Sequence, residues 1–139
     1  MFFKKKSHIP TTKIYTDTIT NAKNIVFYNE NGQEEYTNII SNQIQINKTL
    51  NYLGKQIESA SIEITTNVVG YTTVETKHIE NVIYTVGSEN EKDFYFVELG
   101  LENADVTISI SKAQNGCLTS IQINATGNIK DGITMLRNN

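Results

Sequence analysis

A short stretch near the middle of the chain alternates between apolar and polar side chains, and this alternation constrains the fold more than any other feature. The small or apolar positions are Ala60, Ile62, Ile64, Thr66 and Val68, and the polar positions between them are Ser61, Glu63, Thr65 and Asn67. Successive side chains of a β-strand point to opposite faces of the sheet, so the pattern predicts a strand with one buried and one solvated face. Ile, Val and Thr, which favour strands, make up 44 of the 139 residues. The chain is therefore predicted to be mostly β.

The clearest single element that the sequence predicts is a β-hairpin near the C-terminus. Two runs of alternating residues surround Asn115-Gly116, a pair that tolerates the positive φ angles of a tight turn. The apolar or small positions of the two runs are Ala104, Val106, Ile108 and Ile110, then Cys117, Thr119, Ile121, Ile123 and Ala125. Residues 104–125 are therefore expected to form two antiparallel strands.

This hairpin, residues 104–125, resembles a pattern found in several bacterial β-rich domains of unknown function. In those domains a strand is followed by a return strand similar to Gly-Leu-Leu-Thr-Ser-Ile. The corresponding residues here are Gly116, Cys117, Leu118, Thr119, Ser120 and Ile121. Those domains carry no assigned activity, so the resemblance implies neither a function nor a site.

Turn signals separate further strand-like runs along the rest of the chain. Their number and spacing predict an antiparallel β-sandwich or flattened barrel of eight to ten short strands, with at most two short helices. One short helix is expected over residues 48–58, where Leu50, Leu53 and Ile57 have helical spacing. A turn is expected over residues 100–103.

The domain organisation predicted from the sequence is simple. Residues 1–12 are expected to be a flexible N-terminal lead-in, residues 13–127 a single β domain, and residues 128–139 a C-terminal turn or tail, with helical spacing of its apolar residues. No internal repeat or linker divides the chain.

The charge and the apolar content of the chain restrict its partners and its location. Lys4, Lys5 and Lys6 supply three of the positive charges, so the rest of the chain is more negative than the formal net charge of −3. A negative body repels phosphate, and nucleic-acid binding is not expected. The sequence as given has neither the apolar run of a secretory signal nor the roughly 20 apolar residues of a membrane span. A cytoplasmic or virion-associated location is expected.

The residues that carry catalysis in other proteins are few in this sequence. Its histidines are His8 and His78, its one cysteine is Cys117, and it has neither a nucleophile elbow nor a phosphate-binding glycine loop. We expect no enzymatic activity, no cofactor and no metal site. An enzyme remains as one alternative, and it would require His78 to meet a carboxylate or Cys117 in a cleft.

Three consecutive aromatic residues give the main indication of an interaction surface. Phe94, Tyr95 and Phe96 place aromatic rings on both faces of one expected strand. Such a strand lies either at the centre of a sandwich or under a partner chain. We therefore expect a structural or interaction protein that self-associates, or binds another protein, as a component of a bacteriophage or bacterial assembly. A monomeric ligand-binding β module with an apolar pocket is the other alternative.

Overall fold

The computed structural model describes residues 9–20, 25–28, 31, 33–37, 43–66, 68–89 and 94–130. These residues form the strands β1 (Pro10–Thr20), β2 (Ile25–Tyr28), β3 (Glu34–Thr37), β4 (Gln43–Leu53), β5 (Gln56–Thr65), β6 (Tyr71–Glu89), β7 (Phe94–Lys112) and β8 (Leu118–Lys130). Neighbouring strands run antiparallel in one sheet, in the order β1-β4-β5-β8-β7-β6-β2-β3. The predicted all-β, antiparallel fold is confirmed.

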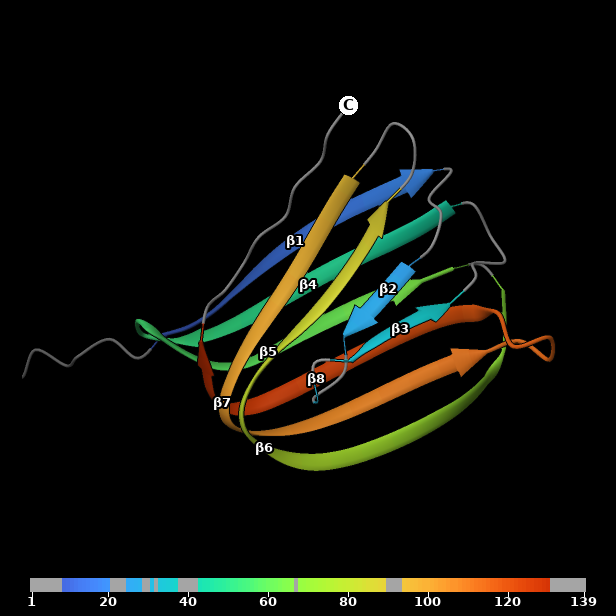
Figure 1. Cartoon of the computed structure of the whole chain (residues 1–139). Helices are drawn as coiled ribbons and strands as arrows, with labels where there is room; N and C mark the ends of the chain where they lie inside the picture. The colour runs from blue at the N-terminus through green and yellow to red at the C-terminus, as the bar shows by residue number, and fades with distance from the viewer. Residues whose placement is uncertain are drawn as a thin grey trace, which may run out of the picture.

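The sheet folds over on itself so that its two ends form two layers (Figure 1). β6 and β7 are each 19 residues long and bend part-way, so each strand belongs to both layers. The six-stranded layer contains β1, β4, β5 and β8 with residues 104–112 of β7 and 71–79 of β6. The four-stranded layer contains residues 94–101 of β7 and 82–89 of β6 with β2 and β3. The sheet is open, because β1 and β3 lie at opposite ends of the strand order.

The bend between the layers is built by unusual backbone geometry in β7 and β8. The register of these strands shifts between Leu101 and Ala104, which marks a β-bulge. Asn103 in the bulge has φ +54°, and Gly127, which pairs with Ala104, has φ +115°. The prediction of a turn over residues 100–103 is wrong, because the strand continues through the bulge and only changes direction.

The core lies between the two layers. The six-stranded layer contributes Ile62 and Ile123, which are fully buried and pair across β5 and β8. The four-stranded layer contributes Leu99 and Tyr84, and the ring of Tyr84 stacks on Phe27 with centroids 5.8 Å apart. Burial of apolar area on both layers stabilises the fold by roughly 25 cal/mol per Å².

The short helix expected over residues 48–58 is wrong. This segment forms the hairpin of β4 and β5, and its turn at Gly54 has φ +67°, which favours glycine. Ile46, Lys48 and Leu50 are all buried and follow a two-residue period. The alternation is not recognisable in the sequence, because a lysine at position 48 suggests a solvent-exposed side chain.

The C-terminal hairpin predicted over residues 104–125 is confirmed. Val106 pairs with Ala125, and Ile110 pairs with Ile121. Strand structure extends beyond the expected domain limits, since β1 begins at Pro10 and β8 ends at Lys130. The helical spacing noted in the C-terminal tail falls mainly on residues 131–139, which lie outside the described residues.

Candidate functional site

The outer face of the six-stranded layer carries four rows of side chains that run in register across all six strands. The rows, read from β1 to β6, are Thr12, Asn51, Ser59, Thr126, Asp105 and His78; Ile14, Thr49, Ser61, Asn124, Thr107 and Thr76; Thr16, Asn47, Glu63, Gln122, Ser109 and Val74; and Thr18, Gln45, Thr65, Ser120, Ser111 and Thr72. We call these 24 residues the polar face. It holds no Lys or Arg, and most of its side chains are uncharged donors and acceptors.

Hydrogen bonds between neighbouring strands connect parts of these rows. Thr12 Oγ1 donates to Asn51 Oδ1 at 2.9 Å, and Asn51 Nδ2 donates to Ser59 Oγ at 2.8 Å. At the other side of the layer, the hydroxyl groups of Thr72 and Ser111 lie 2.6 Å apart. Cross-strand pairs of this kind stabilise a sheet by roughly 0.2–1 kcal/mol each.

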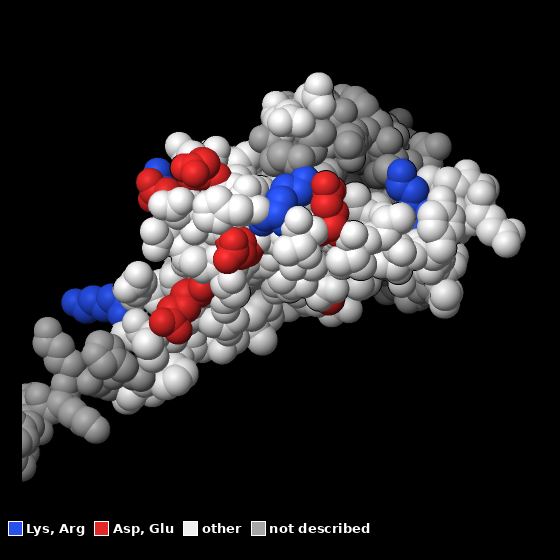
Figure 2. Space-filling view, turned by 90° about the horizontal axis from the view of Figure 1, so that it is seen from below, with Lys and Arg blue, Asp and Glu red and all other residues white. Residues whose placement is uncertain are grey.

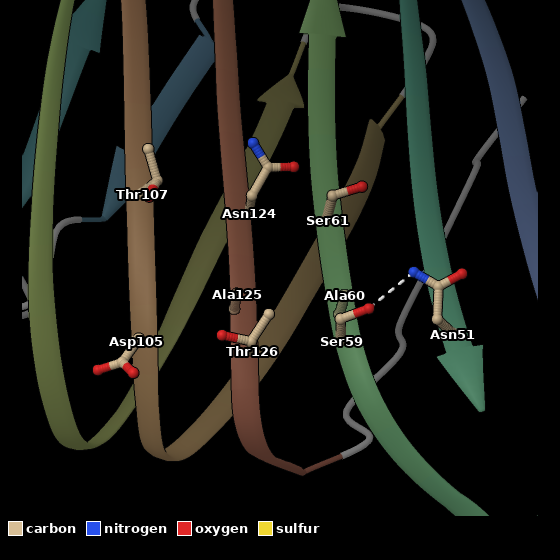
Figure 3. A pocket seen from close by; sticks show the side chains of 9 residues that line it. All are labelled: Asn51, Ser59, Ala60, Ser61, Asp105, Thr107, Asn124, Ala125 and Thr126. Carbon is tan, nitrogen blue, oxygen red and sulfur yellow. Dashed lines mark hydrogen bonds between the residues drawn. The ribbon is translucent and has the colours of Figure 1, made fainter. Parts of the chain in front are cut away.

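A shallow hollow of about 330 Å³ lies on the polar face where its first two rows cross β4, β5, β8 and β7. It is lined by Asn51, Ser59, Ala60, Ser61, Asp105, Thr107, Asn124, Ala125 and Thr126. The polar side chains around it stand on the side of the layer that faces the viewer in Figure 3. This hollow is polar, unlike the apolar pocket expected for a ligand-binding module, and its lining is suited to hydrogen bonding with a neutral polar molecule.

His78 lies against Asp105 beside this hollow, and the two side chains form an ion pair when the imidazole is protonated. Its Nδ1 lies 3.0 Å from Asp105 Oδ1, and both side chains are more than half exposed. The hydrogen bond to Asp105 raises the pKa of His78 above its ordinary value of 6.5, and the negative charges of Asp105 and Glu80 raise it further. The imidazole is exposed because His78 lies on the solvated face of its strand.

Cys117 does not meet His78. Cys117 precedes β8 at the turn end of the C-terminal hairpin, where Leu118 pairs with Lys112. Asp105, the partner of His78, lies seven positions before Lys112 on β7, which is about 23 Å at about 3.3 Å per residue. The structure thus brings His78 to a carboxylate and leaves the thiol at the other end of the layer.

The β6 edge, which we define as the side of residues 71–84 that faces away from β7, pairs with no other described strand. Tyr71 and Val74 are more than half exposed along it. On the inner face of the same strand, Lys77 Nζ lies 3.2 Å from Glu75 Oε1. An edge with unpaired backbone N–H and C=O groups is a template for pairing with another strand.

The other edge of the six-stranded layer is formed by β1. It begins with Pro10, which has no backbone N–H to donate. Lys13 on this strand places its Nζ 5.2 Å from the centre of the Tyr52 ring, where its ammonium group makes a cation–π interaction. β1 is therefore a less complete template than β6.

The structure places Phe94, Tyr95 and Phe96 at the start of β7, where they pair with Glu89, Ser88 and Gly87. Their side chains lie outside what the structure describes. Over residues 94–99, β6 is the one described strand that pairs with β7. Among the described strands, the aromatic segment thus lies at an edge of the four-stranded layer.

Among the described residues, charged side chains form no extensive patch on the side of the molecule where β6 lies. Figure 2 views this side, and the Lys and the Asp or Glu side chains occur there as separate spots on a mainly uncharged surface. In the part of the chain that the structure describes, no three His, Cys, Asp or Glu residues are grouped to hold a metal ion. The same ranges contain no helix long and apolar enough to cross a membrane.

The sequence did not reveal the polar face or the β6 edge, because both depend on strand order. One local signal was available for the edge. Glu75 and Lys77 have opposite charges two positions apart in a strand of β-branched residues.

Comparison with protein-family models, with curated proteins and with solved structures finds no match to this chain.

Proposed function

We propose that the protein is a non-enzymatic structural or interaction protein that self-associates through a sheet edge. The observation that carries this proposal is the β6 edge, which is long, apolar at Tyr71 and Val74, and unpaired among the described strands. Proteins that stay monomeric commonly protect such an edge with proline, outward lysine or a covering segment. A role as a component of a bacteriophage or bacterial assembly fits the small size of the chain and its strands rich in Asn, Thr and Ile.

Strand pairing between copies would provide both affinity and order. Main-chain hydrogen bonds of an added strand give affinity, and the side chains on its two faces determine which register is accepted. The pairing would also extend the polar face across the contact, because the rows on the outer face end at β6. A self-associating sheet of this kind needs no catalytic residue, cofactor or metal.

Light scattering after size-exclusion chromatography, over a tenfold range of concentration, tests the proposal. We expect a mass above the 15.6 kDa of one chain. Replacing Thr76 by Lys (Thr76→Lys) should lower this mass, since an outward lysine at an edge opposes strand pairing. Thr126→Lys, on the same face but away from both edges, is the matched control and should keep the wild-type mass. A wild-type protein that is monomeric at every concentration would overturn the proposal.

The hollow on the polar face favours a second candidate function, the binding of a neutral polyhydroxyl ligand such as an oligosaccharide. Its lining combines amide, hydroxyl and carboxylate groups, which can donate to and accept from the hydroxyl groups of such a ligand. Chemical-shift mapping with maltopentaose, cellopentaose and chitopentaose tests this function. Shifts should appear at Asn124 and Thr126, and they should be lost in Asn124→Lys. Absence of shifts with all three probes at millimolar concentration would count against it.

A further inference from the structure

We infer that two copies of the chain pair antiparallel along the β6 edge as a closed two-fold dimer, with Thr76 on the axis. This inference rests on the proposed self-association and adds its symmetry, its register and the residues that select them. A two-fold contact uses the same edge of both copies and stops at two, whereas pairing β6 with β1 of the next copy would give a ring or an open-ended filament.

The charges of β6 distinguish between the possible registers. When a two-fold axis perpendicular to the sheet passes through one residue of the strand, residues at equal distances on either side of it lie opposite each other. An axis at Glu75 would place two carboxylates opposite each other, and an axis at Lys77 would do the same with two ammonium groups. Like charges directly opposite destabilise a strand pair.

An axis at Thr76 gives the complementary arrangement. It places Glu75 of each copy opposite Lys77 of the other, and both residues lie on the inner face, where they already form an ion pair within one strand. Two ion pairs thus become a cluster of four alternating charges. Axes at Val74 or His78 place neither charge opposite the other sign, so the axis at Thr76 is the only one of the five central registers that pairs them.

The remaining contacts of this register contain no repulsion between directly opposite residues. On the outer face Val74 lies opposite His78, and Thr76 lies opposite its own copy. On the inner face Thr73 lies opposite Ile79, which is buried in its own core. The pairing covers residues 71–81 and ends where β6 bends toward the four-stranded layer, since residue 80 lies beside the bulge of β7.

The resulting dimer would carry the polar face on one continuous twelve-stranded layer. The outer-face rows of the two copies are related by the axis, so Thr76 of one copy continues directly into Thr76 of the other. The exposed Val74 side chain would gain a neighbour on the partner. β1 remains at both outer ends, and Pro10 at its start has no backbone N–H to donate to a further strand.

Charge reversal tests the register directly. Lys77→Glu places carboxylates opposite each other in a homodimer and should raise the dissociation constant at least about tenfold. Glu75→Lys should do the same with ammonium groups. The doubly reversed protein, Glu75→Lys with Lys77→Glu, should dimerise as the wild type does. A mixture of the two single variants should form heterodimers, because Glu75 and Glu at position 77 of one chain then face Lys at both positions of the other.

A cysteine at the axis provides an independent readout. In a Cys117→Ser background, Thr76→Cys brings two thiols together at a Cα separation of about 4.5–5.5 Å, which a disulfide accepts. Mild oxidation should convert most of the protein to a covalent dimer on a non-reducing gel. Thr126→Cys should remain monomeric on the gel, and so should Ile14→Cys in the middle of the β1 edge.

The outcomes separate this inference from the proposed function. Cross-linking at Ile14 but not at Thr76, or single charge reversals that leave the mass unchanged, would overturn the β6 register while self-association stands. Masses that grow beyond a dimer with concentration would overturn the closed symmetry. A wild-type monomer at all concentrations would overturn both proposals.

Discussion

Lys48 of β4 donates a hydrogen bond from Nζ to the backbone carbonyl oxygen of Glu98 on β7, across the interior between the two layers. The lysine is 1% exposed, and its neighbours on the same strand face, Ile46 and Leu50, are buried as well. No described strand pairs with β7 on the side away from β6 over residues 94–99. A buried lysine thus provides a donor to an edge that has no neighbouring strand in the described part of the chain.

Substitution of Lys48 should reveal this contact as a contribution to stability. Lys48→Met keeps the volume but removes the donor, and we expect it to lower the free energy of unfolding by about 1–3 kcal/mol. Lys48→Ala also leaves a cavity and should lower it by about 2–5 kcal/mol. Urea unfolding measures both. Lys130→Ala removes an exposed lysine whose Nζ lies 3.9 Å from Glu102, and it should change stability by less than about 0.5 kcal/mol. Equal effects of all three substitutions would contradict this role.

Gly127 should be the least replaceable glycine at the bend. A Cβ at this position would lie 2.7 Å from the carbonyl oxygen of Asn103, and φ is +115°. Gly127→Ala must therefore distort the bulge, and we expect a loss of about 2–4 kcal/mol in the free energy of unfolding. Gly116→Ala is the matched control, since φ is +83° there but no atom lies within 4 Å of the added Cβ. Its cost should be about 1 kcal/mol. A smaller loss for Gly127→Ala than for Gly116→Ala would contradict the steric argument.

The sequence predicted those parts of the fold whose signal is local. The alternation of Ile121 and Ile123 with polar residues identified β8, and Asn115-Gly116 identified the turn before it. The alternation around Lys48 was hidden because the partner of its ammonium group is 50 residues away in the chain. The residues next to Lys48 in the sequence do not indicate that its side chain reaches a carbonyl oxygen in the other layer.

The candidate site was less predictable than the fold, for a geometric reason. Which strand becomes an edge depends on the complete strand order, and residues on six strands form the polar face only after that order is known. Phe94, Tyr95 and Phe96 could be proposed from the sequence as an interaction surface because they are three consecutive aromatic residues. Glu75 and Lys77 became informative only once the described strands were found to leave one side of their part of β6 unpaired.

The ion pair between His78 and Asp105 should make stability depend on pH in one direction. The hydrogen bond to Asp105 raises the pKa of His78 in the folded protein above its ordinary value of 6.5. The protonated form is therefore favoured by folding, so this contribution is complete below pH 6.5 and is lost as the pH rises through the folded pKa. The wild type should exceed Asp105→Asn in stability by more at pH 5.5 than at pH 9. Urea midpoints at the two pH values measure the difference. In an NMR titration of the imidazole, the pKa of His78 should fall toward 6.5 in Asp105→Asn, and a wild-type value at or below 6.5 would contradict the assignment.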